Sequence, residues 1–341
     1  MPPKATKRRT PVIAVTSGDP GGVGPEIVVR MFARHRPGRS IALLIGARKV
    51  LDPLCGGRSG HIHVLDGKDM GSVQQALGSA SVFVLDTGCR ARYAVGRDSV
   101  GGGRHAGRAL DIACGLARDG LVDALVTAPI SKRSLTLAGY PFTGHTEMFA
   151  RYFDAPDCQM VMVYRKFRVV PLTRHIPVGE ISSALTAEGI VKALAVVRRA
   201  LREEFAIPNP HIAVAALNPH AGEGGVVGRE EIEIIQPALR RARQMGIRVT
   251  GPVAGDSLFQ HAGNGTFDAF VSMYHDQGLI PFKMVARRRG VNVTVGLPVV
   301  RTSVDHGVAY DIAGKGVASI TSLRQAYRLA EQLAQRRIMG V

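Results

Sequence analysis

The chain has 341 residues, 45% of them apolar and 21% charged, which is the composition of an ordinary globular protein long enough for about two domains. No apolar run approaches the ~20 residues of a membrane helix, and the basic start lacks a cleavage-site pattern, so we expect no membrane span, no signal peptide and a cytoplasmic location. The net charge of +17 raises the alternative of a non-enzymatic, basic nucleic-acid-binding protein, but its excess is dispersed, so we expect no nucleic-acid partner and a field that attracts anionic small molecules.

Short β-branched runs alternate with amphipathic stretches through the first half of the chain. Strands are predicted at residues 12–16, 41–45, 61–65, 82–85 and 123–127. Pro25 opens a helix after the first strand, because its missing N–H is harmless in a first turn, and a second helix is predicted at residues 104–118. This βαβα alternation predicts an α/β architecture with a largely parallel sheet.

The second half adds an antiparallel element. Two strand-like runs, 160–164 and 168–172, are joined by a tight turn at Arg165 and Lys166, which indicates a hairpin and therefore a mixed sheet. Further helices are predicted at 187–204, 229–245 and 322–337, and further strands at 211–217 and 269–273.

No linker, internal repeat or low-complexity tract marks a domain boundary, so the hairpin guides the division. Residues 1–10 are expected to form a disordered basic arm. Residues 11–128 together with 301–341 are expected to form the first α/β domain, and residues 129–300 the second.

Three histidines follow directly after strand-like apolar runs: His175 in VVPLTRHIP, His220 in VAALNPHAGEGG and His275 in AFVSMYHDQG. In open α/β sheets, ligand sites lie beyond the carboxyl ends of strands. Neutral imidazoles suit Zn²⁺ and similar divalent cations, and a catalytic centre keeps one position open. Any one of these histidines alone would be assigned a structural role, but three in the same topological position predict a metal site.

Two glycine-rich loops, GDPGGVGPE and NPHAGEGG, allow two interpretations. Glycines before a helix N-terminus can cradle a phosphate. Neither loop matches GxGxxG or GxxxxGK[ST], so a tight strand-to-helix turn is an equal alternative.

Lys283, Asn292 and Arg301 lie nine residues apart with apolar residues between them. Lysine and arginine are usually solvated, but here they flank a buried-looking run, and together they would hold a doubly anionic substrate. The triplet at 287–289 is expected on the surface. His145 and Thr146 begin a helix in FTGHTE, where helix capping by Thr146 is the structural alternative.

Two carboxylates stand near the proposed cation: Asp256 in GPVAGDSLF and Asp276 beside His275. Each could bind the cation, orient a histidine or move a proton. Both are therefore candidate catalytic residues.

The motifs GDPGGVGPE, TAPISK, PFTGHTE, LNPHAGEGG, GPVAGDSLF, YHDQG, RGVNVTVGLP and RTSVDHGVAYDIAGKGVA occur in this order from Val12 to Ala318. They closely resemble the 4-hydroxythreonine-4-phosphate dehydrogenases of pyridoxal phosphate biosynthesis, the PdxA family. Two segments also resemble the wider isocitrate/isopropylmalate dehydrogenase superfamily. The resemblance implies a two-domain α/β/α fold of that superfamily, which is not a Rossmann fold, and a homodimer with its interface on the second domain.

The resemblance also implies roles for single residues. His175, His220 and His275 become ligands of one divalent metal, Zn, Mg or Co, with one histidine reaching across the dimer. His145, Thr146, Lys283, Asn292 and Arg301 fall on positions that bind a phosphorylated hydroxy acid. The cofactor, NAD or alternatively NADP, is held by the loop that contains His306, Gly307, Asp311 and Gly314.

The implied reaction oxidises the 3-hydroxyl of 4-phosphohydroxy-L-threonine to a β-keto acid, which decarboxylates to 3-amino-2-oxopropyl phosphate. The alternative is a 4-phospho-D-threonate or 4-phospho-D-erythronate dehydrogenase of sugar-acid catabolism. The motifs leave these substrates unseparated, because they differ only in the group at C2 and its stereochemistry.

Overall fold

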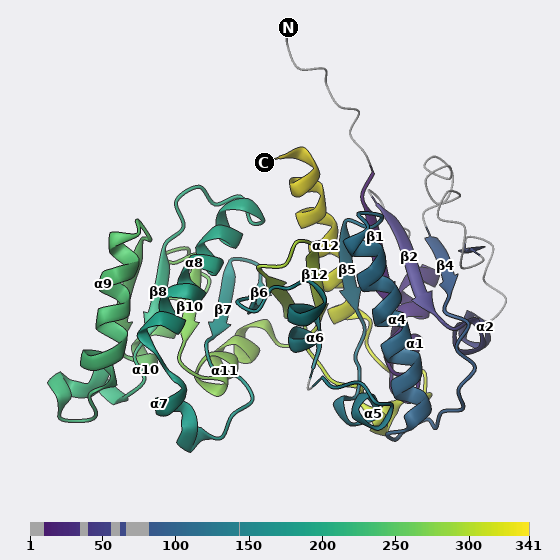
Figure 1. Cartoon of the computed structure of the whole chain (residues 1–341), viewed down its shortest axis with the longest axis horizontal. Helices are drawn as coiled ribbons and strands as arrows, with labels where there is room; N and C mark the ends of the chain where they lie inside the picture. Colours follow the sequence, from purple (N-terminus) through teal and green to yellow (C-terminus); the bar gives the residue numbers. More distant parts are fainter. Residues whose placement is uncertain (1–9, 35–39, 56–61, 66–81, 143, 341) are drawn as a thin grey trace, which may run out of the picture. The chain divides into compact units, whose positions relative to one another are not determined.

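The computed structural model describes residues 10–34, 40–55, 62–65, 82–142 and 144–340. The chain divides into two compact units (Figure 1): unit 1 is Met1–Asp154 with Pro298–Val341, and unit 2 is Ala155–Leu297. The predicted disordered arm lies outside the described residues, apart from Thr10. No helix among the described residues has the length and apolarity to cross a membrane.

The segment 129–154 belongs to unit 1, whereas its expected place was the second domain. The reason is a contact that no local pattern reveals. Helix α5 (Lys132–Leu137) packs on α4 (Val100–Arg118). In addition, the hydroxyls of Tyr140 and Tyr152 both donate hydrogen bonds to the carboxylate of Asp111 on α4.

Unit 1 contains a parallel sheet. Its strand order is β3 (Ile62–Leu65), β4 (Val82–Asp86), β2 (Ile41–Gly46), β1 (Val12–Thr16), β5 (Ala124–Thr127) and β12 (Val300–Val304), and every neighbouring pair is parallel. All residues of β1, β2, β5 and β12 are buried. Continuous burial is typical of parallel strands that are covered on both faces.

Two long helices, α4 and α12 (Thr321–Met339), pack on this sheet. Helix α4 contacts β1, β2 and β5 and crosses the sheet of unit 1 (Figure 1), while α12 contacts β5 and β12. The N-terminus of α4 is capped by the Ser99 hydroxyl, which accepts a hydrogen bond from Gly102 N at 3.0 Å. Among the described residues, unit 1 also contains α1 (Gly24–Arg34), α2 (Arg48–Cys55) and α6 (His145–Tyr152).

Unit 2 contains a mixed sheet, as predicted. Its strand order is β11 (Val291–Val295), β6 (Gln159–Tyr164), β7 (Phe167–Pro171), β10 (Ala269–Ser272), β8 (Ile212–Ala215) and β9 (Val249–Val253). The β6–β7 pair is the expected antiparallel hairpin, with Arg165 in the left-handed conformation at its turn. Strand β11 is also antiparallel to β6, whereas β7, β10, β8 and β9 run parallel.

Unit 2 has five α-helices: α7 (Ile181–Ala184), α8 (Ala187–Glu203), α9 (Gln236–Gln244), α10 (Gly255–Leu258) and α11 (His275–Ala286). The helix predicted at 229–245 is split, because a π turn at Glu231–Ile235 precedes α9. Strand β9 and helix α11 were not predicted.

An aromatic core fixes α11. Phe282, on that helix, is fully buried, and its ring lies 5.7 Å from the ring of Phe167 on β7, which in turn lies 5.2 Å from Phe270 on β10. Aromatic pairs of this kind stabilise by about 0.5–1.5 kcal/mol beyond the burial of their area. The N-terminus of α11, which begins at His275, is therefore anchored to the sheet.

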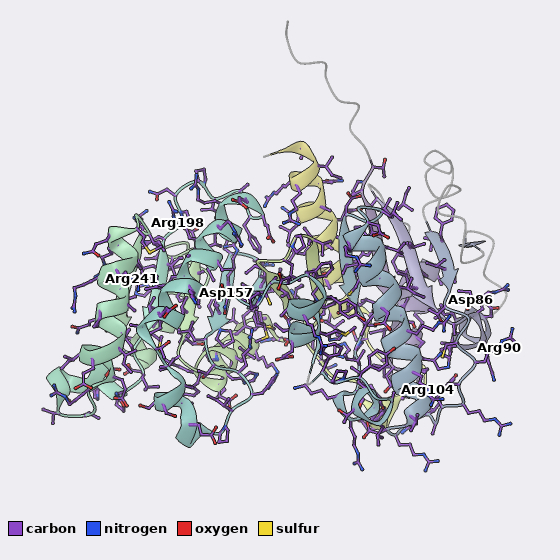
Figure 2. All side chains as sticks on the ribbon, in the orientation of Figure 1. Asp86, Arg90, Arg104, Asp157, Arg198 and Arg241 are labelled. Carbon is purple, nitrogen blue, oxygen red and sulfur yellow. The ribbon has the colours of Figure 1, made fainter. Side chains whose placement is uncertain are left out.

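The basic side chains are distributed over both units. The arginines labelled in Figure 2 lie on different elements, including Arg104 on α4, Arg198 on α8 and Arg241 on α9. Arg287, Arg288 and Arg289 are exposed at the end of α11, which confirms the surface position expected for this triplet.

Candidate active site

Two of the three predicted metal-binding histidines lie next to each other in unit 2. His175 follows β7, and His275 begins α11 directly after β10, the neighbouring parallel strand. Their ring centroids are 6.0 Å apart, and the rings are tilted by 38°. His175 is exposed and His275 half-buried, so an ion could reach both imidazoles.

Asp276 orients the imidazole of His275 for binding a cation. Its carboxylate oxygen Oδ1 lies 2.6 Å from Nδ1 of His275, and this contact assigns the proton of a neutral imidazole to Nδ1. The lone pair of Nε2 is then available to a cation. A carboxylate on the distal ring nitrogen is the usual arrangement around a metal-bound histidine, so this donor set fits a divalent metal such as Zn²⁺.

His220 stands in an unusual backbone turn. Residues 220–224 all have positive φ, and three of them, His220 (49°), Ala221 (55°) and Glu223 (44°), are not glycine. A left-handed conformation costs roughly 1–2 kcal/mol at a residue with a side chain. Strain of this size persists where the surrounding structure enforces it, often at a functional site.

A buried carboxylate enforces this turn. Glu231 is 1% exposed, and its Oε1 accepts hydrogen bonds from the backbone N–H groups of Leu217 and Asn218, both at 2.8 Å. Its Oε2 accepts a third from the Asn218 side chain at 2.9 Å. A Cβ on Gly222 would lie 2.6 Å from that same oxygen, so only glycine fits there. The amides of Leu217 and Asn218, at the start of the NPHAGEGG loop, therefore bind Glu231 and are not open to a phosphate.

Within a single chain, the described residues contain no group of three His, Cys, Asp or Glu side chains that could hold a metal ion. His220 therefore does not join the His175–His275 pair. Asp256 is exposed in the first turn of α10, a helix that contacts the His220 turn.

Unit 1 buries the predicted anion-binding arginine. Arg301, on β12, is 1% exposed, and its Nη2 donates a 2.7 Å hydrogen bond to the Thr127 hydroxyl at the end of β5. Its guanidinium carbon lies 5.0 Å from the centre of the Phe149 ring on α6. Burial of a cation is costly without compensating groups, which separates Arg301 from the solvated arginines elsewhere.

His145 shares the Phe149 ring with Arg301. Its imidazole stacks on Phe149 at 6.0 Å with an interplanar angle of 8°. Burial, together with the charge of Arg301, holds the pKa of His145 well below its usual value, so the ring is neutral near pH 7. Its Nε2 is enclosed and has no hydrogen-bond partner among the described residues. Such a group is available to a ligand.

The remaining predicted substrate residues fall in both units. Thr146 is half-buried on α6, and the helix cap is Gly144, so the capping alternative for Thr146 is wrong. In unit 2, Lys283 is exposed on α11. Asn292, on β11, has a buried Oδ1 that lacks a hydrogen-bond partner within the described part of the chain.

The predicted cofactor residues lie in the loop between β12 and α12. His306, Gly307, Asp311 and Gly314 are all exposed. Gly314 has φ +75°, and a Cβ there would approach the Val95 side chain to 3.2 Å. The loop therefore presents the Asp311 carboxylate and, at Gly314, exposed backbone without a side chain.

The GDPGGVG loop forms a tight turn. Residues 17–24 are all buried, and the amides that a phosphate would use are already engaged. Asp19 N donates to Pro129 O, Gly21 N to Asp19 Oδ1, Gly22 N to Asp19 O and Val23 N to Val308 O, at 2.8–3.0 Å. The structural interpretation of this loop is the correct one.

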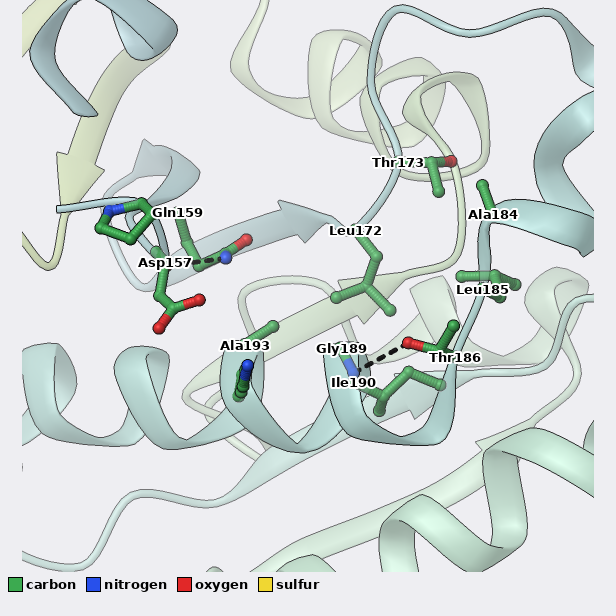
Figure 3. Close-up of a pocket in the computed structure, with 12 residues that line it drawn as sticks. Asp157, Gln159, Leu172, Thr173, Ala184, Leu185, Thr186, Gly189, Ile190 and Ala193 are labelled. Carbon is green, nitrogen blue, oxygen red and sulfur yellow. Dashed lines mark hydrogen bonds between the residues drawn. The ribbon is translucent and has the colours of Figure 1, made fainter. Parts of the chain in front are cut away.

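A cavity of about 190 Å³ in unit 2 contains none of the predicted residues (Figure 3). It lies beside the first turn of α8, where the Thr186 hydroxyl caps Gly189 N at 3.0 Å. Its polar lining is largely engaged: Thr173 donates to Met273 O, Gln159 to Asp157 O, and Lys192 pairs with Glu188. This cavity has no evident link to the candidate site.

No motif points to two residues that contact the candidate site residues or their loop, Phe149 and Glu231. Phe149 packs against both Arg301 and His145, and no motif marks a phenylalanine in such a position. For Glu231, the nearest signal is the glycine-rich NPHAGEGG loop, whose first residue, Asn218, donates hydrogen bonds to the Glu231 carboxylate.

Comparison with known proteins supports a family assignment. The family model described as "Pyridoxal phosphate biosynthetic protein PdxA" matches residues 40–330. A 4-hydroxythreonine-4-phosphate dehydrogenase from Desulforapulum autotrophicum is 41% identical over 326 residues, covering 94% of each chain. A relative from Bradyrhizobium diazoefficiens, provisionally named D-threonate 4-phosphate dehydrogenase, is 38% identical and covers 94% of this chain and 96% of its own.

The fold comparison agrees. The crystal structure of 4-hydroxythreonine-4-phosphate dehydrogenase from Klebsiella pneumoniae superposes with a TM-score of 0.85 at 36% identity, covering 97% of this chain and 100% of that one. Nearly full coverage of both chains means that the two α/β units are shared as a whole. The chain described here belongs to the PdxA family.

Proposed function

We propose that this protein is a 4-hydroxythreonine-4-phosphate dehydrogenase of pyridoxal 5'-phosphate biosynthesis. It oxidises the 3-hydroxyl of 4-phosphohydroxy-L-threonine with NAD as hydride acceptor. The observation that carries the proposal is the 41% identity, over 94% of both chains, to a relative of that name. The alternative, a 4-phospho-D-threonate dehydrogenase, is supported by one relative at 38% identity.

His175 and His275 would hold a divalent cation in unit 2. Bound there, the cation would lower the pKa of the substrate hydroxyl and stabilise negative charge on its oxygen as the carbonyl forms. Asp276 orients His275 through Nδ1. Asp256, exposed at the start of α10, is our candidate for accepting the hydroxyl proton, and NAD, when bound, would accept the hydride from C3. The resulting β-keto acid loses CO₂ to give 3-amino-2-oxopropyl phosphate.

The five residues that the family resemblance indicates would supply groups for the substrate's polar and anionic parts. In unit 1, Arg301 supplies a planar fork of donors suited to carboxylate or phosphate, and neutral His145 and Thr146 supply further hydrogen-bonding groups. In unit 2, Lys283 supplies a point charge and Asn292 a buried amide with an unused oxygen. The loop with His306, Gly307, Asp311 and Gly314 would bind NAD.

A second copy of the chain would complete the metal site. His175 and His275 are neighbours in one chain, so we assign the crossing histidine to His220. The exposed side chains of Ile280 and Met284, one turn apart, give the second copy an apolar face on α11, the helix that begins at His275. Exposed apolar residues grouped in this way mark interaction surfaces.

The direct test is NADH formation from NAD and 4-phosphohydroxy-L-threonine by metal-depleted protein, before and after addition of Zn²⁺, Mg²⁺ or Co²⁺. We expect activity and CO₂ release only after a cation is restored. A full rate in the presence of excess chelator would contradict the role given to the histidines.

A further inference from the structure

The loop between β12 and α12 is fixed from one side by a single tyrosine. Tyr310 lies in the short 3₁₀ turn Tyr310–Ile312, next to Asp311. Its hydroxyl is 3.1 Å from Asp19 Oδ2, 2.9 Å from Asp98 Oδ1 and 3.3 Å from the Ser134 hydroxyl. One phenol thus links the loop to the turn after β1, the segment before α4 and the first turn of α5.

The acceptors around Tyr310 are themselves held firmly. Asp19 is fully buried, and its other oxygen accepts a hydrogen bond from Gly21 N at 2.8 Å. Asp98 accepts hydrogen bonds from the hydroxyls of Ser131 and Ser134, which help to lower its pKa. Burial raises the pKa of Tyr310 to about 12, so its hydroxyl stays protonated and can donate near neutral pH.

Backbone contacts fix the rest of the loop. Val308 O accepts a hydrogen bond from Val23 N at 2.9 Å, and a Cβ on Gly22 would lie 2.6 Å from that carbonyl oxygen. Further along, Ala318 O accepts from Arg30 Nη1 at 2.7 Å. The exposed residues Asp311 and Gly314 therefore lie between two anchors, Tyr310 and Ala318.

We propose that Tyr310 is a positioning residue for cofactor binding: its hydroxyl holds the Asp311–Gly316 stretch in the conformation that receives the dinucleotide. The inference rests on the proposed function, in which this loop binds NAD. Tyr310 does not take part in hydride transfer. Removing its hydroxyl therefore weakens NAD binding because the loop must be ordered when the cofactor binds.

The substitution Tyr310→Phe isolates the hydroxyl, since it keeps the ring. Its matched control is Tyr327→Phe, because Tyr327 is a buried tyrosine on α12 of unit 1 whose hydroxyl lies 2.8 Å from the Ser40 hydroxyl. Asp98→Asn tests the acceptor without altering the loop. Asp311→Ala tests whether the loop binds NAD.

The experiment measures the Kd of NAD by calorimetry on the four full-length variants and the unsubstituted protein, together with KM for NAD and kcat. We expect Tyr310→Phe to raise both Kd and KM about fivefold, the effect of losing one hydrogen bond, with kcat within about twofold. Asp98→Asn should act in the same direction, and Tyr327→Phe should leave the Kd of NAD unchanged.

Two results would overturn the assignment of Tyr310. The first is an unchanged Kd of NAD in Tyr310→Phe while Asp311→Ala weakens NAD binding. The second is an equal loss of NAD affinity in Tyr310→Phe and Tyr327→Phe, which would indicate a general loosening of the fold. If Asp311→Ala binds NAD as the unsubstituted protein does, the loop is not the cofactor site. The proposed cofactor placement would then fail together with the inference.

Discussion

The guanidinium carbon of Arg301 lies 5.0 Å from the centre of the Phe149 ring. The same ring is stacked by His145, so one phenylalanine aligns a buried cation and a neutral imidazole. Because the Arg301 charge helps to keep His145 neutral, the pair presents one positive charge and one uncharged hydrogen-bonding ring. This combination suits an anionic group that must be held without excess charge nearby.

Arg301→Lys should weaken substrate binding while the fold survives. Lysine keeps the charge but loses the planar fork and the stacking on Phe149. We expect KM for the phosphorylated substrate to rise about tenfold or more, since losing one partner of a buried charged contact costs ~2 kcal/mol or more. Steady-state kinetics would measure this. Arg118→Lys, at an exposed position of α4, is the control and should be unaffected.

The stability of the protein should fall as the solution is acidified below the pKa of a free histidine, ~6.5. The folded state keeps His145 neutral, so below that pH the unfolded state binds the extra proton and gains stability. The measurement is chemical denaturation at pH 7.5 and pH 5.5. The decrease in the free energy of unfolding between these pH values should be smaller by about 1 kcal/mol in His145→Gln than in the unsubstituted protein.

Part of the acid sensitivity should remain in His145→Gln, because burial also lowers the pKa of His105. The exposed His261 serves as the control. If the loss of stability between pH 7.5 and pH 5.5 were identical in His145→Gln and His261→Gln, His145 would be protonated in the folded protein.

Mixing inactive variants should reveal which histidine crosses between subunits. If His220 comes from a second copy, a mixed dimer of His175→Ala and His220→Ala has one intact site. Random exchange of subunits should make half of the dimers mixed, and each mixed dimer has one intact site out of two. The mixture should therefore regain about one quarter of the full activity. The measurement is the rate after the subunits are unfolded and refolded together.

The pairing of His175→Ala with His275→Ala provides the matched control. These two residues are neighbours in one chain, so no site in that mixture is intact and no activity should return. Activity in this control, with none in the His175–His220 mixture, would assign the crossing to another histidine.

Glu231→Gln should loosen the His220 turn. The new amide group would face the Asn218 amide, donor against donor, inside a buried site. We expect a loss of about 2 kcal/mol in the free energy of unfolding and about tenfold weaker binding of Zn²⁺ or Co²⁺. Glu233→Gln removes only an exposed ion pair with Arg229, so it should change stability by less than ~1 kcal/mol. Equal metal affinity in Glu231→Gln and the unsubstituted protein would argue against the turn's role.

The strands were predictable where apolar runs are short and bounded by turn residues. Val12–Thr16 was predicted with its observed bounds, and the Arg165–Lys166 turn identified the hairpin. Helix α11 was missed because Gly278 and Pro281 lie inside it and are poor helix formers. Burial of Leu279 and Phe282 in the aromatic core overrides that local preference.

Tertiary contacts explain the remaining differences. The place of residues 129–154 depends on two tyrosine hydroxyls that reach Asp111 on α4, and no local pattern indicates such a contact. In the candidate site, the motifs identified Arg301 and the three histidines, but not which of these side chains are buried or adjacent. A tyrosine in a loop, such as Tyr310, has no local signature, because its partners come from three distant segments.

Substrate preference tests the central claim most directly. The measurement compares kcat/KM for 4-phosphohydroxy-L-threonine, 4-phospho-D-threonate and 4-phospho-D-erythronate, with NAD and a saturating divalent cation. We predict that 4-phosphohydroxy-L-threonine is preferred by about 100-fold or more, as expected when a buried site discriminates by hydrogen bonds. A higher kcat/KM for 4-phospho-D-threonate or 4-phospho-D-erythronate would contradict the assignment to pyridoxal phosphate biosynthesis.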